Sequence, residues 1–228
     1  MYLLRALALV VLLGSTTTRA AEWQVVSHEP GFTLYTRSVA GQDLKEFRGV
    51  IRIKASMRTV LPMLVDADHM PQWFFNMSEA RLLEIGSKDG SFLYFVIKGM
   101  WPVSDRDAVV RLQLHQNTGT LALNIAASAE PEHTPLMRNR VRIPRLRAVW
   151  TVTPLSATET EVKLEGHADP GGSIPLWMAN LVVEHLPESS LRQLRERIEK
   201  APADAEALHA DPRISRLLSG IRYPESAP

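Results

Sequence analysis

Eight stretches between residues 31 and 168 are predicted to form β-strands. Apolar and polar residues alternate along 31–37, 44–53, 146–154 and 160–168, which is the period of half-buried strands, and the other four stretches are 81–85, 91–97, 107–116 and 120–127. Polar or glycine-containing turns separate them, for example near Gly41, at residues 86–90 and at residues 117–119. Neighbouring strands are therefore expected to form antiparallel hairpins. The basic, proline-interrupted segment 130–144 is predicted to be a flexible crossing rather than a strand.

Two segments carry helix signals. Ser56 is suited to cap a helix over residues 57–65. After the last strand, Ser173 is expected to cap a long C-terminal helix with Pro175 in its first turn, where a missing N–H costs little. Pro187 is expected to kink this helix. Its apolar stripe follows three- and four-residue spacings and consists of Ile174, Trp177, Met178, Leu181, Val182 and His185. Residues 201–228 are expected to form a tail with short helices around Ala205 and Arg213.

The first 20 residues have the pattern of a secretory signal peptide. Arg5 precedes an apolar run over residues 6–14, which is shorter than the roughly 20 residues of a transmembrane span. Cleavage is expected after Ala20, and Ala21 is a nearly equal alternative. The chain has no cysteine, which excludes a disulfide and a cysteine-linked lipid anchor. We expect a periplasmic or secreted mature chain without a transmembrane helix; the alternative is that these residues form the first apolar helix of a cytoplasmic domain.

Composition excludes several function classes. The 228 residues are 45% hydrophobic and 22% charged, the size and balance of one globular domain with extensions. A net charge of +1 gives no reason to expect nucleic acid as a partner. The sequence shows no glycine-rich phosphate loop and no cluster of His, Asp and Glu at zinc or calcium spacing, so we expect neither a cofactor nor a metal site.

Three segments, taken in order, resemble the START (StAR-related lipid transfer) family. They are the tryptophan-led WFFNMSEARLL at 73–83, the Arg-Asp strand opening in WPVSDRDAVVR at 101–111 and GGSIPLWMANL at 171–181. The resemblance spans about residues 23 to 200 and implies one START-like lipid-binding domain over residues 21–200. It implies an α+β helix-grip fold, in which a curved antiparallel sheet wraps around a long C-terminal helix and encloses a hydrophobic tunnel.

The same resemblance implies a polar anchor inside the tunnel. Glu79 corresponds to the acidic residue, and Arg106 to the arginine, of a buried ion pair in sterol-binding relatives. Such a pair could hold the polar head of a ligand whose hydrocarbon is buried, or it could only tie the structure together. Asp107 is expected to be structural, because adjacent strand residues point to opposite faces.

Further ligand contacts are expected from large side chains near the tunnel, although such residues also serve as ordinary core. They are Trp73, Tyr94, Trp101, Trp150, Trp177, Met178, Leu181 and His185. No catalytic arrangement of residues stands out. We therefore expect non-catalytic binding, with transfer of a lipid, sterol-like molecule or fatty acid and transient contact with a membrane. A cyclase or aromatase acting in the same cavity is the alternative, and a third interpretation is a partner-binding module whose cavity is filled.

Overall fold

A ten-stranded sheet dominates the computed structural model, which describes residues 21–87 and 90–224 without the side chains of residues 87, 176–178 and 181–182. The strand order is β1-β2-β3-β10-β9-β7-β6-β5-β4, with β8 beside β6. The strands are β1 (Gln24–Glu29), β2 (Phe32–Arg37), β3 (Glu46–Ile53), β4 (Met77–Ser87), β5 (Gly90–Ile97), β6 (Asp105–Gln116), β7 (Leu123–Ala129), β8 (Arg140–Arg142), β9 (Arg145–Pro154) and β10 (Thr160–Asp169). The expected signal peptide, residues 1–20, lies outside the described residues.

The hairpins expected from the alternating pattern are confirmed. Antiparallel pairs join β2 to β3, β4 to β5, β6 to β7 and β9 to β10. Two further antiparallel pairs join strands that are not consecutive in the sequence. β10 pairs with β3, and β7 pairs with β9. These long-range pairs bring both ends of the chain's strand region into one continuous surface.

Two strands were not expected from the sequence. β1 is an edge strand whose Val25 and Val26 are both exposed, so it lacks the alternation of a half-buried strand. β8 lies in the segment predicted to be a flexible crossing, and that prediction is wrong for Arg140–Arg142. This strand pairs in parallel with the start of β6. Its Arg142 forms a buried ion pair with Asp107, a tertiary contact that a local pattern does not reveal.

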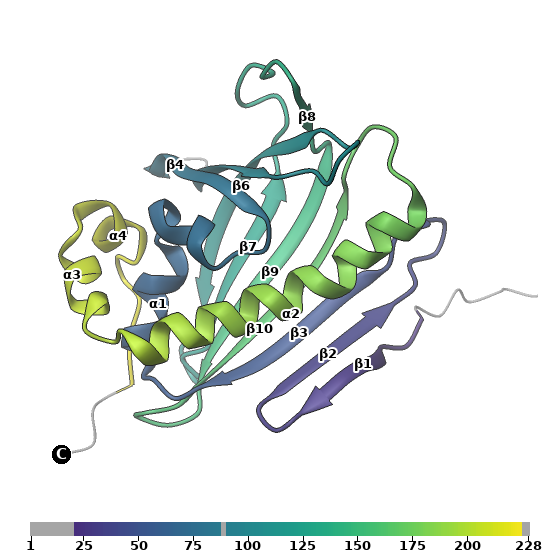
Figure 1. The fold of residues 1–228 in the computed structure, drawn as a ribbon. Helices are drawn as coiled ribbons and strands as arrows, with labels where there is room; N and C mark the ends of the chain where they lie inside the picture. Colours follow the sequence, from purple (N-terminus) through teal and green to yellow (C-terminus); the bar gives the residue numbers. More distant parts are fainter. Residues whose placement is uncertain (1–20, 88–89, 225–228) are drawn as a thin grey trace, which may run out of the picture.

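Helix α2 (Leu176–Lys200) lies across the concave face of the sheet (Figure 1). Leu191 is fully buried against β3, where Gly49 provides room: a Cβ atom at Gly49 would lie 2.5 Å from a Leu191 methyl carbon. The helix is unbroken through Pro187. Its predicted capping by Ser173 is wrong, since the N-cap is Pro175 in an extended conformation. A proline disfavours helical geometry in the residue before it, which favours a helix that starts after Ile174.

The remaining helices close the far end of the sheet. Ser56 caps α1 (Met57–Val65) as expected, its hydroxyl accepting a 3.1 Å hydrogen bond from the Thr59 N–H. A short 3-10 helix, η1 (Ala67–Gln72), follows. The short helices predicted in the tail are confirmed as α3 (Asp204–Ala210) and α4 (Pro212–Leu217), which Figure 1 shows beyond the end of α2. Their side chains Ala205, Ile214 and Leu217 belong to the main core, so the packed core extends past residue 200.

Candidate functional site

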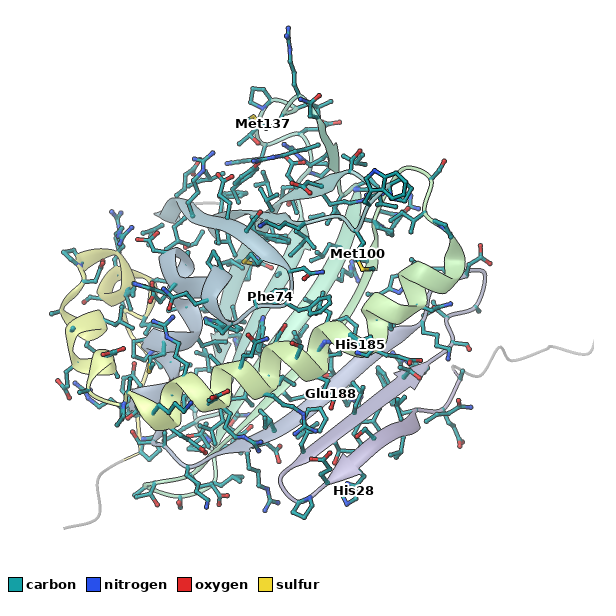
Figure 2. The ribbon with its side chains drawn as sticks, in the orientation of Figure 1. His28, Phe74, Met100, Met137, His185 and Glu188 are labelled. Atoms are coloured by element: carbon teal, nitrogen blue, oxygen red, sulfur yellow. The ribbon has the colours of Figure 1, made fainter. Side chains whose placement is uncertain are left out.

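A cavity of about 260 Å³ lies between α2 and the concave face of the sheet. Its walls are mostly apolar and include the aromatic side chains of Phe47, Phe74, Phe95 and Trp150. Phe74 and Met100 lie between α2 and the sheet (Figure 2). Among the described residues, the polar ones at its wall are Lys45, Asn76, Lys98 and Arg106. Arg147 and His167 also border it, but they alternate with the inward Ala148 and Gly166, so their side chains point to the other face. A ligand in this space would therefore be surrounded almost entirely by hydrocarbon.

Small residues on the inner face of the sheet create the empty space. Ala127, Ala148 and Gly166 are register partners on the adjacent strands β7, β9 and β10. One row further along the strands, the partners are Ile125, Trp150 and Leu164, which fill the same face with large side chains. Side chains on one face recur every second residue, so Ala127 and Ala148 leave a hollow that the neighbouring row closes. The Phe47 ring covers Gly166, since a Cβ atom there would lie 2.6 Å from Phe47 Cζ.

Arg106 is the buried charge of this cavity. It stands near the start of β6, is 7% exposed, and donates a hydrogen bond from Nη1 to the Ser104 carbonyl. Its Nε is buried and has no hydrogen-bond partner among the described residues. Burial lowers the pKa of the Arg106 guanidinium, an effect that the charge of Asp105 opposes only in part. The Asp105 carboxylate itself accepts a 3.0 Å hydrogen bond from the Gly99 N–H.

The expected ion pair between Glu79 and Arg106 is wrong. A β-bulge between Met77 and Glu79 shifts the register, so that Glu79 lies opposite Val96 rather than Phe95. Phe95 lines the cavity, whereas Val96 belongs to a cluster on the other face of the sheet. Because a bulge adds one residue to its strand, it turns the side chains that follow to the opposite face.

Glu79 instead belongs to a polar group on the outer face. Its carboxylate lies 3.1 Å from Nη1 of Arg140 and 3.7 Å from Nε of Arg81. Arg140 also donates a 2.6 Å hydrogen bond to the hydroxyl of Tyr94, so Tyr94 faces this group and not the cavity. Burial raises the pKa of Tyr94, and the hydrogen bond from Arg140 opposes the rise. Glu79 and Tyr94, both predicted to contact the ligand, therefore do not face the cavity.

Asp107 lies on the outer face, as the alternation of strand residues predicted. Its two carboxylate oxygens accept 3.0 Å hydrogen bonds from Nε and Nη2 of Arg142, and both side chains are buried. Arg142 also donates to the carbonyls of Pro131 and Thr134. Sequence reasoning missed Arg142, since nothing local marks an arginine in a proline-interrupted segment as a buried partner.

The other predicted contacts are distributed unevenly. Trp150 lines the cavity. Trp73 is not among the lining residues; it is fully buried and packs edge-on against Trp150, with ring centres 6.0 Å apart. Trp101 is 92% exposed, and His185 on α2 is exposed as well (Figure 2), so neither lines the cavity. The side chains of Trp177, Met178 and Leu181 lie outside those that the structure describes.

Comparison with known proteins identifies the fold. The sequence model of the START domain family matches residues 6–203 of this chain. The chain belongs to the START domain family. A protein of Pseudomonas aeruginosa, the uncharacterized protein PA1579, is 32% identical over 182 residues, which are 79% of this chain and 89% of that protein.

Solved structures with the same fold include bacterial and human START proteins. The STAR-related lipid transfer protein of Xanthomonas axonopodis is 35% identical, with a TM-score of 0.70 over 77% of this chain and 98% of that chain. Human STARD10 has a TM-score of 0.74 at 15% identity, over 90% of this chain and 84% of that chain. This START domain therefore has the helix-grip fold expected from its sequence.

In this START domain the cavity reaches three connections at one end of the sheet. Leu44 and Lys45 precede β3, Gly99 to Val103 connect β5 to β6, and Pro170 and Ile174 lead into α2. Met100 is 38% exposed and Trp101 beside it is almost fully exposed, so an apolar surface lies next to the cavity's end. Within residues 21–87 and 90–224, no helix is long and apolar enough to cross a membrane, and no cluster of His, Asp and Glu could hold a metal ion.

Proposed function

We propose that this START domain binds an apolar or amphipathic ligand in the cavity under α2 and does not alter it chemically. The observation that carries this proposal is an apolar cavity of about 260 Å³ with one buried cationic side chain, Arg106. Burying hydrocarbon contributes roughly 25 cal/mol per Å², so even a ligand with a single chain gains substantially here. The similarity to a STAR-related lipid transfer protein at 35% identity supports the same class of ligand.

The size of the cavity favours a small ligand. Pockets for small molecules commonly measure about 300–1,000 Å³, and this one lies just below that range. A molecule with one hydrocarbon chain or a compact ring system fits this space better than a phospholipid with two chains.

We further propose that the ligand is exchanged with a membrane at the end of the cavity next to Trp101. Trp101 and Met100 expose apolar surface in the β5–β6 connection, and tryptophan is favoured at the interface between membrane and water. The signal-peptide pattern of residues 1–20 supports a location outside the cytoplasm, which N-terminal sequencing of the exported protein would test.

Extraction of ligands tests the binding function. The protein is purified without detergent, and its bound molecules are released with organic solvent and analysed by mass spectrometry. We expect a hydrophobic or amphipathic molecule, present at up to one copy per chain in native mass spectrometry. If no such molecule is present and the protein binds none of a fatty acid, a sterol and a phospholipid, the proposal is wrong. Incubation with the recovered ligand separates binding from catalysis, since a product of changed mass would favour the cyclase alternative.

A further inference from the structure

The charge of Arg106 is not explained by the protein's own contacts. A buried cation is costly unless an anion or several acceptors compensate it. Arg106 has one hydrogen bond, to the Ser104 carbonyl, and its Nε has none in the described part of the chain. Asp105, the acidic neighbour, is engaged by the Gly99 N–H, and Glu79 lies on the other face of the sheet with Arg140. The protein therefore maintains a buried cation without a salt bridge at the cavity wall.

The edge of the guanidinium that lacks partners is the one that binds carboxylates. Nε and Nη2 of an arginine form a planar fork that donates two parallel hydrogen bonds to a carboxylate. Arg142 uses these two atoms to hold Asp107. In Arg106 neither Nε nor Nη2 donates a hydrogen bond to a described residue. Arg142 therefore has a carboxylate and several carbonyls as partners, whereas Arg106 has one carbonyl and no carboxylate.

We infer that the ligand is an amphiphile with one hydrocarbon chain, and that its carboxylate head group binds to Arg106. This inference rests on the proposed function, because it assumes that a ligand occupies the cavity. It assigns the missing counter-ion to the ligand rather than to the protein.

The charges around the cavity favour an anion over other head groups. No Asp or Glu lines the described part of the wall, and the charged residues there are Lys45, Lys98 and Arg106. Arg147 alternates with the inward Leu146 and Ala148, so its side chain points to the other face. A zwitterionic head would bring a positive group that finds no carboxylate here. A phosphate monoester carries a charge of about −1.5 to −2 and three strong acceptors, more than one guanidinium satisfies, whereas a carboxylate matches it in charge and geometry.

The position of Arg106 also orients the ligand. A Cβ atom at Gly172 would lie 3.9 Å from Nη2 of Arg106, so the guanidinium lies beneath the connection from β10 to α2. Trp150 and Leu164 line the cavity beyond the row of small residues. The carboxylate is thus placed near the start of α2, and the hydrocarbon chain extends over Ala127 and Ala148 toward Trp150.

The test compares three ligands that share one hydrocarbon chain. Oleate, oleyl alcohol and oleyl phosphate are titrated into the delipidated protein at pH 8, below their micelle concentrations, with the wild type, Arg106→Met and Arg106→Lys. Wild type is expected to bind oleate about 10- to 100-fold more tightly than oleyl alcohol, the usual gain from a hydrogen bond to a charged group. Arg106→Met is expected to lose this preference, and a cooperative urea transition like that of the wild type shows that it is folded. Arg106→Lys is expected to retain part of the preference.

Three results would overturn the inference. Wild type could bind oleate and oleyl alcohol equally, or Arg106→Met could keep the preference for oleate; in both cases a ligand is still bound, so the proposed function stands. Tighter binding of oleyl phosphate than of oleate by wild type would overturn the choice of carboxylate. Failure of wild type to bind any of these ligands, or a sterol, would instead contradict the proposed function itself. The comparison within wild type remains decisive if a variant fails to fold.

Discussion

Arg106 and Asp107 are neighbours in the sequence, but their side chains lie on opposite faces of β6 and only Asp107 has a bidentate ion-pair partner. Asp107 is held by two 3.0 Å hydrogen bonds from Arg142, while Nε of Arg106 has no partner among the described residues. One arginine of this region therefore stabilises the fold, and the other remains available to a ligand.

This difference predicts opposite effects on stability. Arg142→Met leaves the carboxylate of Asp107 buried and unpaired, so the free energy of unfolding is expected to fall by about 3–5 kcal/mol. Arg106→Met removes a buried charge that has one hydrogen bond, to the Ser104 carbonyl, and a buried Nε without a partner, so the free energy of unfolding is expected to stay constant or rise by up to about 1–3 kcal/mol. Urea unfolding of the ligand-free proteins measures both changes. Equal losses in the two variants would show that Arg106 is a structural residue.

A double variant checks the reason for the larger loss. Replacing Asp107 by Leu in the Arg142→Met background removes the unpaired charge, so part of the lost stability is expected to return. Additive losses from the two substitutions in urea unfolding would mean that the ion pair is not the dominant contact of Arg142.

Filling the cavity should weaken binding without unfolding the protein. Ala148→Phe places a ring in the space next to Ala127 and Gly166, and the affinity for a fluorescent fatty acid is expected to fall at least about tenfold, since a lost hydrophobic burial of 1.4 kcal/mol already has this effect. Ala126→Phe is the matched control, because Ala126 pairs with Val149 on the outer face of the same strands. If both variants bind like wild type, the ligand does not occupy this cavity.

Trp101 should affect exchange with membranes more than binding. Trp101→Ser removes an exposed indole beside the cavity's end, so transfer of a fluorescent lipid between vesicles is expected to slow several-fold while the equilibrium affinity stays within about twofold. Leu155→Ser is the control, since Leu155 is also exposed but lies in the β9–β10 turn. Equal rates for Trp101→Ser and wild type in a vesicle transfer assay would exclude this loop from membrane contact.

The stability that Asp211 contributes as the cap of helix α4 should decrease at acidic pH. Asp211 caps this helix, and hydrogen bonds from the Arg213 side chain and backbone lower the pKa of Asp211 to about 2. A carboxyl group with a lowered pKa in the folded state stabilises the fold above its unfolded pKa of 3.8, and this contribution is lost as the pH falls through about 2. Asp211→Ala is therefore expected to cost about 0.5–2 kcal/mol at pH 7. Its difference from wild type in urea unfolding should shrink below pH 4, whereas a difference that does not change with pH would exclude the carboxylate as its source.

Much of this fold follows from the sequence, since the alternation of apolar residues within residues 31–168 predicted four hairpins that the structure contains. The failed pairing of Glu79 with Arg106 has a local cause, the bulge after Met77, which reverses the face of Glu79 without a visible change in the pattern. Arg142 could not be found because its strand exists through pairing with β6. The cavity did leave a signal in the sequence: Ala127, Ala148, Gly166 and Ala168 are small residues at inward positions of predicted strands.

The methionine methyl groups provide the most direct test of where the ligand binds. Met70, Met77 and Met100 line the cavity, whereas Met137 is 50% exposed on the loop before β8, away from the cavity wall (Figure 2). NMR spectra of protein with ¹³C-labelled methionine methyl groups are recorded before and after addition of one equivalent of oleate. The resonances of Met70, Met77 and Met100 are expected to shift, and that of Met137 is expected to stay in place. A shift confined to Met137, or no shift when binding is saturated, would contradict a ligand site between α2 and the sheet.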